Sequence, residues 1–180
     1  MPGSWDLLLF RALNEGWTCS AMDFLARLIQ HSWPGIAAGA VLAACMILKG
    51  GRRARTILLA GVAAVILTDI TCTWFLKPLV ARVRPSMVIE GVRLVVGKKS
   101  GFGFPSNHAA NLAAASTVLG LAYPRRAWIG ALVTLFVGYT RIYAGVHYPS
   151  DVLGGFLIGF LFGMAAYLIV RRRLGDPRVS

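Results

Sequence analysis

Three short segments of the sequence combine cations and histidines in a way that suits chemistry on a phosphate group. The first segment contains Lys77 and, seven residues later, Arg84. The second and third each contain one histidine, His108 and His147. Cations balance the charge of a phosphoryl group, and a neutral histidine can attack phosphorus or move a proton. The pattern therefore predicts a site that binds a phosphate and reacts with it.

The third segment contains a pair that is typical of nucleophilic catalysis. Asp151 follows His147 by four residues, and Pro149 between them suits the first turn of a helix. A carboxylate in that turn can reach back to the histidine, fix its tautomer and leave a lone pair on the other ring nitrogen. His108 has no carboxylate near it in the sequence, which suits a residue that donates and accepts a proton.

A helix that begins near Ser106 is expected to complete the anion site. Its first backbone N–H groups and the Ser106 hydroxyl can donate to phosphate oxygens at the positive end of the helix dipole. The predicted phosphate-binding residues are Lys77, Arg84, Ser106, Asn107 and Arg141. No acidic cluster accompanies these segments that could hold magnesium, so the sequence predicts no metal ion and no other cofactor.

The composition places these segments in a membrane protein. Of the 180 residues, 57% are hydrophobic and 14% are charged, whereas soluble domains have about 45–50% apolar and about 25% charged residues. A helix that crosses a bilayer needs about 17–25 apolar residues. Such stretches occur at 32–48, 56–76, 106–122, 127–143 and 150–170. The sequence therefore predicts an all-α bundle of five membrane spans, in a single domain of residues 1–180.

The segments outside these spans have different characters. In residues 1–30, Trp5, Leu8 and Leu9 recur at helical spacing with polar residues between them, which predicts an amphipathic helix in the membrane interface. Residues 86–104 form the longest loop, and residues 171–180 form a basic tail.

The distribution of charge predicts the orientation in the membrane. Because five spans alternate sides, the loops at 49–55 and 125–126 share one face with the tail, and this face holds ten Lys and Arg but one acid. The positive-inside rule makes that face cytoplasmic. All three reactive segments then lie together at the outer face. Most of the net charge of +12 is thus explained by orientation rather than by nucleic-acid binding.

The three segments resemble the signature motifs of the type 2 phosphatidic acid phosphatase (PAP2) superfamily, which read K-x6-R-P, P-S-G-H and S-R-x5-H-x3-D. This sequence contains Lys77…Arg84-Pro85, Pro105-Ser106-Asn107-His108 and Thr140-Arg141…His147…Asp151. The spacing inside each motif matches. Two positions differ, because Asn107 replaces the motif glycine and Thr140 replaces the motif serine.

The resemblance implies a metal-independent lipid phosphatase in the cytoplasmic membrane of a bacterium, with its site on the outer side. His147 would attack phosphorus and form a phosphohistidine. His108 would protonate the leaving oxygen and then activate water, while Asp151 orients His147. The implied substrate is a membrane lipid with a phosphate or diphosphate headgroup. Candidates are undecaprenyl diphosphate, phosphatidylglycerol phosphate, phosphatidate and lipid A 1-phosphate.

Two other functions share some of these features. A phosphotransferase would pass the phosphoryl group from the histidine to another lipid. A small anion or lipid transporter would bind the anion without reacting, but the sequence shows no inverted repeat. Lys98 and Lys99 in the long loop are expected to contact either a lipid headgroup or the anionic membrane surface.

Several residues lie outside these assignments. Arg82 does not belong to the first motif and is expected to be a snorkelling cation at the end of a span. Asp69 lies within the second span and is expected to support the site rather than to react. A repeat of small residues on the last span predicts a packing face, used within the chain or in a homodimer: Gly155, Gly159 and Gly163.

Overall fold

The computed structural model describes residues 3–174, and this part of the chain contains helices and loops but no β-strand. The α-helices are α1 (Ser4–Glu15), α2 (Ser20–Gln30), α3 (Ser32–Lys49), α4 (Gly51–Ile70), α5 (Lys77–Val80), α6 (Pro85–Val88), α7 (Asn107–Ala122), α8 (Ala127–Tyr143) and α9 (Pro149–Leu174). A π-helix, Thr71–Leu76, connects α4 to α5, and a 3₁₀ turn, Pro124–Arg126, connects α7 to α8. The prediction of an all-helical chain is confirmed for these residues.

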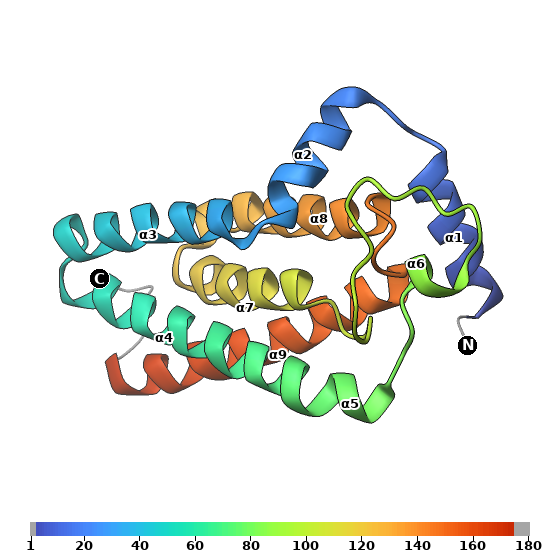
Figure 1. The fold of residues 1–180 in the computed structure, drawn as a ribbon. Coiled ribbons are helices and arrows are strands. Elements are labelled where there is room, and N and C mark those ends of the chain that lie inside the picture. The colour runs from blue at the N-terminus through green and yellow to red at the C-terminus, as the bar shows by residue number, and fades with distance from the viewer. Residues whose placement is uncertain (1–2, 175–180) are drawn as a thin grey trace.

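Helix α7 occupies the middle of the bundle, with α4, α8 and α9 packed around it (Figure 1). The side chains that it buries are mostly small: Ala109, Ala110, Ala113, Ala114, Val118 and Ala122. Small side chains allow helix backbones to approach closely, which is how helices pack where no hydrophobic effect acts between them.

The small-residue face of α9 supplies the other half of this contact. A Cβ atom added at Gly155, Gly159 or Gly163 would lie 2.7, 2.0 or 2.6 Å from a backbone oxygen of α7 or of the residue before it. The face is therefore filled by the same chain. The prediction that it serves packing within the chain is confirmed, and this packing leaves the three glycines no surface for the homodimer that the sequence also allows.

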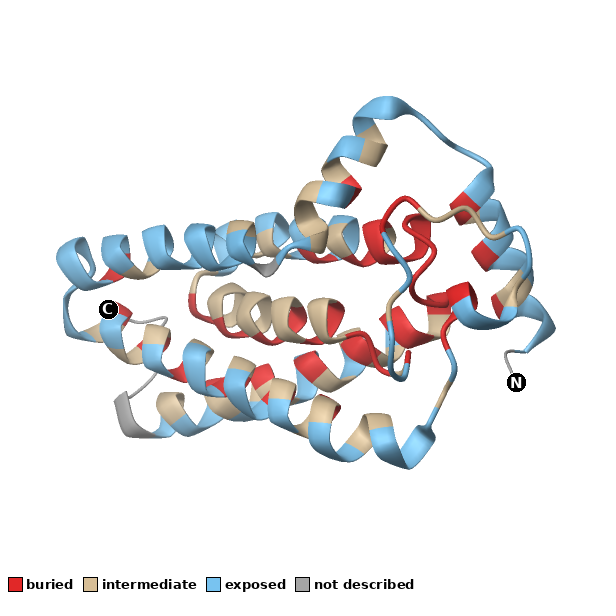
Figure 2. Ribbon diagram, in the orientation of Figure 1, coloured by how far each residue is buried: buried red, intermediate tan, exposed pale blue. Residues whose placement is uncertain are grey.

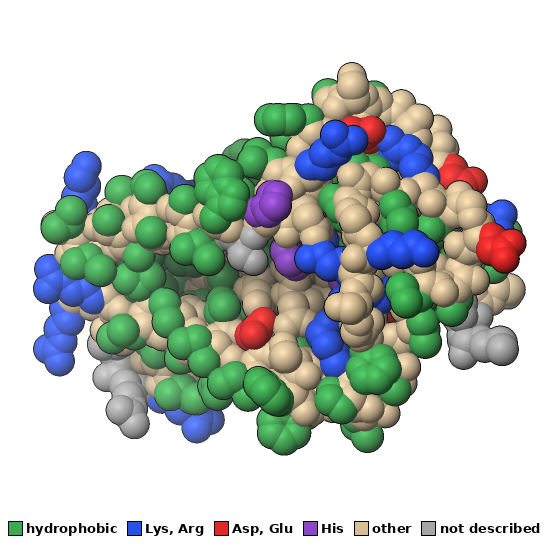
Figure 3. All heavy atoms as spheres, in the orientation of Figure 1, with side chains coloured by type: hydrophobic (Ala, Val, Ile, Leu, Met, Phe, Trp, Pro, Cys, Tyr) green, Lys and Arg blue, Asp and Glu red, His purple; other side chains and the backbone are tan. Residues whose placement is uncertain are grey.

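Two helical stretches are long and apolar enough to cross a membrane, Gly51–Val88 and Pro149–Arg172. A third results if α2 and α3, which meet at a bend, are counted as one span. Helices α7 and α8 have 16 and 17 residues. Large apolar side chains cover the outer surface of the long helices, and Lys and Arg gather at the end where α3 meets α4 (Figure 3).

The first helix buries two polar side chains against the protein and exposes large apolar ones. Helix α1 buries Asp6, Phe10 and Asn14, whereas Trp5 and Leu8 are 53% and 71% exposed. The spacing of four residues places the three buried side chains on one face. The amide of Asn14 donates to the carbonyl oxygens of residues 93 and 143, at 2.9 and 2.8 Å. The apolar face thus points away from the bundle, as expected of a helix beside lipid, although its place in the interface stays a prediction.

The loop at 86–104 is fastened to the helices beneath it. Val95 and Val96 are buried in a cluster with residues of α2 and of the turn after α8. Arg93 forms an ion pair with Asp23 on α2, through contacts of 2.5 and 2.7 Å, and its guanidinium lies 5.0 Å from the ring centre of Tyr143. These contacts fix the loop above the end of the bundle that contains the three reactive segments.

Candidate active site

The structure brings the three reactive segments together at one end of the bundle, where α5, the start of α7 and the turn between α8 and α9 meet. Figure 2 shows that buried residues concentrate there. The buried polar side chains in this region are Arg84, Ser106, Thr140, Arg141, His147 and Asp151. Burial of so many charged and polar groups in one place is costly, and it is typical of functional sites.

His147 lies in the turn before α9 and is 3% exposed. Its Nε2 atom is 3.0 Å from Nη1 of Arg84. A guanidinium has only hydrogens to donate, so the network assigns the lone pair to Nε2 and the proton to Nδ1. Burial lowers the pKa of His147 to about 3, with a smaller lowering from Arg84, against the raising effect of Asp151. The imidazole is therefore neutral at physiological pH, with a lone pair on Nε2.

Asp151 lies behind this imidazole, in the first turn of α9. Its Oδ2 atom is 3.5 Å from Nδ1 of His147 and accepts a hydrogen bond of 2.9 Å from the backbone N–H of Tyr148. Its backbone carbonyl accepts a hydrogen bond of 3.0 Å from the N–H of Ser106, which joins the third segment to the second. Asp151 thus lies next to His147, and its role in orienting the imidazole stays a prediction.

Several donors of the predicted phosphate-binding residues have no partner. Within the described residues, the buried donors without a hydrogen-bond partner include Nε of Arg84, Nε and Nη1 of Arg141, and the Ser106 hydroxyl. Nη2 of Arg141 donates to the Gln30 side chain at 2.6 Å. Buried donors are normally satisfied. A cluster of unsatisfied donors beside a neutral histidine fits an anion with several oxygens, such as phosphate.

Lys77 and His108 complete the ring of predicted residues. The Lys77 ammonium donates to the carbonyl of Pro105 at 3.2 Å and to that of Phe102 at 3.4 Å, which holds the long loop against the start of α7. His108 is half-buried in the first turn of α7. Four cations act on its imidazole electrostatically: Arg141, Lys99, Lys77 and Arg84.

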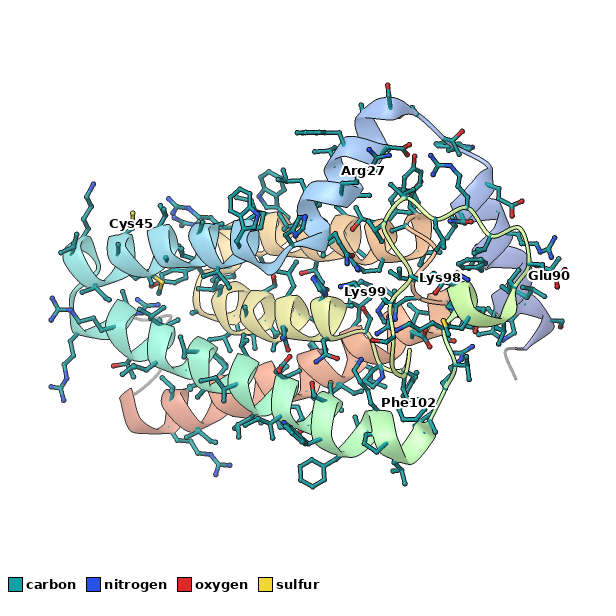
Figure 4. All side chains as sticks on the ribbon, in the orientation of Figure 1. Arg27, Cys45, Glu90, Lys98, Lys99 and Phe102 are labelled. Carbon is teal, nitrogen blue, oxygen red and sulfur yellow. The ribbon has the colours of Figure 1, made fainter. Side chains whose placement is uncertain are left out.

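Lys99, which the sequence leaves with two possible roles, lies beside this site. Figure 4 shows Lys98, Lys99 and Phe102 on the loop after α6, at the end of the bundle away from Cys45. Lys98 is exposed, and Lys99 is half-buried. The pKa of Lys99 is lowered by burial and by the nearby charges of Arg141 and Arg84. Lys99 therefore belongs to the electrostatic environment of the phosphate site.

The side chain of Asn107 points away from this site. Its Nδ2 atom donates to Oδ1 of Asp69 at 2.8 Å and to the Thr73 hydroxyl at 2.7 Å. Asn111, one turn later, donates to the same Asp69 oxygen at 2.8 Å. Contact of Asn107 with a phosphate is thus limited to its backbone N–H group. Asp69 holds the start of α7 against α4, which is the supporting role expected of it.

Two residues of the site were not found by sequence reasoning. Arg82 is not a snorkelling cation, and that prediction is wrong, because its Nη1 donates to Oδ1 of Asp151 at 2.8 Å and its Nη2 forms an ion pair with Asp6 of α1. The second residue is Asp6. An acidic residue on a helix that otherwise has the pattern of a lipid-facing segment was the only indication of this contact in the sequence.

Two further features concern possible metal ligands and a cavity. In residues 3–174, no three His, Cys, Asp or Glu side chains lie together so that they could hold a metal ion. An apolar cavity of about 480 Å³ lies near the opposite end of the bundle, between α3, α4, α7 and α8, and Leu42, Met46, Leu119 and Ile129 line it. None of the predicted reactive residues lines this cavity.

The sequence comparisons agree with this geometry. The PAP2 superfamily matches residues 54–174, which include all three reactive segments. The lipid A 4'-phosphatase of Bacteroides thetaiotaomicron is 38% identical over 112 residues, which are 58% of this chain and 49% of that relative. The undecaprenyl-diphosphatase of Sulfolobus acidocaldarius is 31% identical over 121 residues, which are 66% of this chain and 56% of that relative. The chain thus spans about half the length of these curated relatives.

The fold also has a counterpart among crystal structures. The LpxE protein of Aquifex aeolicus superposes with a TM-score of 0.71 and 27% sequence identity, and the match covers 91% of this chain and 95% of that one. A family match that includes every reactive segment, together with a shared fold along most of the chain, shows that this protein belongs to the PAP2 superfamily.

Proposed function

We propose that this protein is an integral-membrane phosphatase that hydrolyses the phosphate or diphosphate headgroup of a membrane lipid. One observation carries the proposal. The imidazole of His147 is neutral and buried, its Nε2 contacts Nη1 of Arg84, and Arg84, Arg141 and Ser106 carry buried donors without a partner. A nucleophile and an anion site of this kind, built from donors alone, suit phosphoryl transfer through a covalent intermediate.

The geometry supports a two-step reaction. Nε2 of His147 attacks phosphorus, and the bond from phosphorus to the lipid oxygen breaks while His108 gives that oxygen a proton. His108 then takes a proton from water, the water oxygen attacks phosphorus, and the phosphorus–nitrogen bond breaks with its electron pair returning to Nε2. Asp151 stabilises the Nδ1 proton throughout, and the surrounding cations stabilise the charge that develops on the phosphoryl oxygens.

The proposed placement has five spans, namely α3, the stretch from α4 to α5, α7, α8 and α9, in the cytoplasmic membrane of a bacterium. The cluster of Lys and Arg at the junction of α3 and α4 supports a cytoplasmic position for that end. The reactive end then faces the outer, periplasmic side. A lipid would bring its headgroup to this end from the bilayer and leave its tail among the apolar outer surfaces of the helices.

The site and the relatives support the proposed substrate class. Relatives named as a lipid A 4'-phosphatase and as an undecaprenyl-diphosphatase support a phosphorylated lipid as the substrate. The candidates are undecaprenyl diphosphate, phosphatidylglycerol phosphate, phosphatidate and the phosphates of lipid A.

The test is phosphate release from a panel of these four lipids in detergent, with wild type and His147→Ala side by side. The proposal expects release from at least one lipid, inhibition by vanadate, and a loss of activity in His147→Ala of at least about 10³-fold, as for other covalent nucleophiles. Near-wild-type release by His147→Ala would refute the mechanism. Transfer of the phosphoryl group to an added acceptor lipid, in place of phosphate release, would identify a phosphotransferase. Binding of the lipids without either reaction would favour a transporter.

A further inference from the structure

The N-terminal helix reaches the reactive end of the bundle through one carboxylate. Asp6 lies on the inward face of α1 and is 1% exposed. It accepts hydrogen bonds from the backbone N–H of Ser150 at 3.0 Å and from the Ser150 hydroxyl at 2.6 Å. Ser150 belongs to the first turn of α9, where backbone N–H groups have no partner within the helix. Asp6 therefore caps, from another helix, the turn that contains Asp151.

Arg82 connects this carboxylate to the one beside the nucleophile. Its Nη1 donates to Asp151 at 2.8 Å, and its Nη2 donates to Asp6. Its guanidinium carbon lies 4.5 Å from the ring centre of Tyr148, and its side chain is 17% exposed. A planar guanidinium with several donors can bridge two carboxylates in this way, whereas a lysine ammonium acts as a point charge.

The bridge fixes the position of the carboxylate behind His147. Asp151 is fully buried, and its Oδ2 lies 3.5 Å from Nδ1 of His147. The orientation of the imidazole therefore depends on where this carboxylate is held. Arg82 donates to Oδ1 of Asp151, and Asp6 fixes the same guanidinium through Nη2. Other titratable groups that interact electrostatically with Asp151 are Lys77, Arg84 and Tyr148.

We propose that Arg82 and Asp6 are positioning residues, which together hold Asp151 in place, so that helix α1 helps to set the reactivity of His147. The inference rests on the proposed function, because it requires His147 as the nucleophile. It extends the site beyond the three motif segments to the first helix of the chain.

The test uses the full chain in detergent with p-nitrophenyl phosphate, an activated aryl phosphate, as the probe. It measures kcat and KM for Arg82→Gln, Arg82→Lys and Asp6→Asn. The matched control is Asn14→Ala, which loosens the same helix by removing its bonds to two carbonyl groups without a contact to Arg82. His147→Ala reports separately on the proposed function.

Arg82→Gln is expected to lower kcat by about 10- to 100-fold, as for other residues that orient a functional group. KM should change little, because Arg82 acts through Asp151 and not on the substrate. Arg82→Lys keeps the charge but not the fork of donors, so it should recover only part of that loss of kcat. Asp6→Asn should lower kcat less than Arg82→Gln does, because it leaves the contact of Arg82 with Asp151 in place.

Several results would overturn the inference. One is a folded Arg82→Gln with wild-type kcat, and another is an equal loss of kcat in Asn14→Ala. If Arg82→Gln does not fold, wild-type kcat in Arg82→Lys overturns it instead. Activity in His147→Ala would refute the proposed function itself. An inactive His147→Ala beside a wild-type-like Arg82→Gln would overturn this inference alone.

Discussion

Gly159 of α9 lies directly against the backbone of α7, and its replacement by alanine should destabilise the protein strongly. The added Cβ would lie 2.0 Å from the carbonyl oxygen of Ala110 and 2.9 Å from the Cβ of Ala113. Ordinary contact between such atoms is at about 3.5 Å, so the two helices would have to separate by about 1.5 Å. The backbone of α7 cannot yield easily, because its carbonyl groups are held in the hydrogen bonds of the helix.

The magnitude can be worked out by comparison with a matched glycine. Gly61 in α4 has nothing within 4 Å of an added Cβ, so Gly61→Ala gains only helix propensity, about 1 kcal/mol. Gly159→Ala gains the same propensity and adds a clash of about 3 kcal/mol, the upper part of the range for overpacking. The two variants should therefore differ by about 3 kcal/mol, which corresponds to about 6–12 °C in Tm for a chain of this size.

The assay is thermal unfolding of both variants and wild type in one detergent at one heating rate, followed by the circular dichroism of the helices. Equal Tm values for Gly159→Ala and Gly61→Ala would refute the packing argument. A Gly159→Ala protein that is stable but has lost a dimer present in wild type would show that the face joins two copies, contrary to the structure.

Three further predictions concern the site and its supports. Lys99→Ala should raise KM for every phosphorylated lipid that the protein accepts, because Lys99 lies near Arg141 and Arg84. Lys98→Ala, at an exposed position, should leave KM unchanged. Equal effects of the two variants on KM would contradict this assignment. The pKa of His147 is lowered from 6.5 to about 3. Between these pH values the unfolded chain binds a proton that the folded protein does not, so the free energy of unfolding is unaffected by this group above pH 6.5 and decreases as the pH falls toward 3. The slope is about 1.4 kcal/mol for each pH unit, and a plot of Tm against pH should flatten over this range in His147→Gln. Ala81 has φ of +48°, so Ala81→Gly should raise Tm by about 2–4 °C through the relief of about 1 kcal/mol of backbone strain, and an unchanged Tm would show that this turn is not strained.

Sequence reasoning finds the site because its residues lie at the ends of apolar segments. Once spans alternate sides, Lys77, Ser106 and His147 must meet at one face, and the spacing of four residues between His147 and Asp151 fits the turn that begins α9. These inferences depend on local geometry and on the thickness of a membrane, both of which are set by the chain itself.

The contacts that sequence reasoning misses are between segments far apart in the chain. Arg82 and Asp6 are separated by 76 positions, and nothing local indicates that they meet. On α1, the expectation that large apolar residues point inward fails for Trp5 and Leu8, which lipid can cover, while Asp6 is buried against the protein. The side chain of Asn107 could face either the phosphate or α4, and only the position of Asp69 decides between them.

The contact between Arg84 and His147 has a consequence for substrate binding. In the structure, the nucleophilic lone pair of His147 is occupied by Nη1 of Arg84 at 3.0 Å, while Nε of the same guanidinium has no partner. In the proposed mechanism, a phosphoryl group entering the site offers anionic oxygens that attract the guanidinium more strongly than a neutral imidazole does. A charged acceptor adds Coulomb attraction to the hydrogen bond, and two of its oxygens can accept side by side from one guanidinium. Arg84 would then leave Nε2 for the phosphoryl oxygens, so that the substrate itself frees the nucleophile that attacks it.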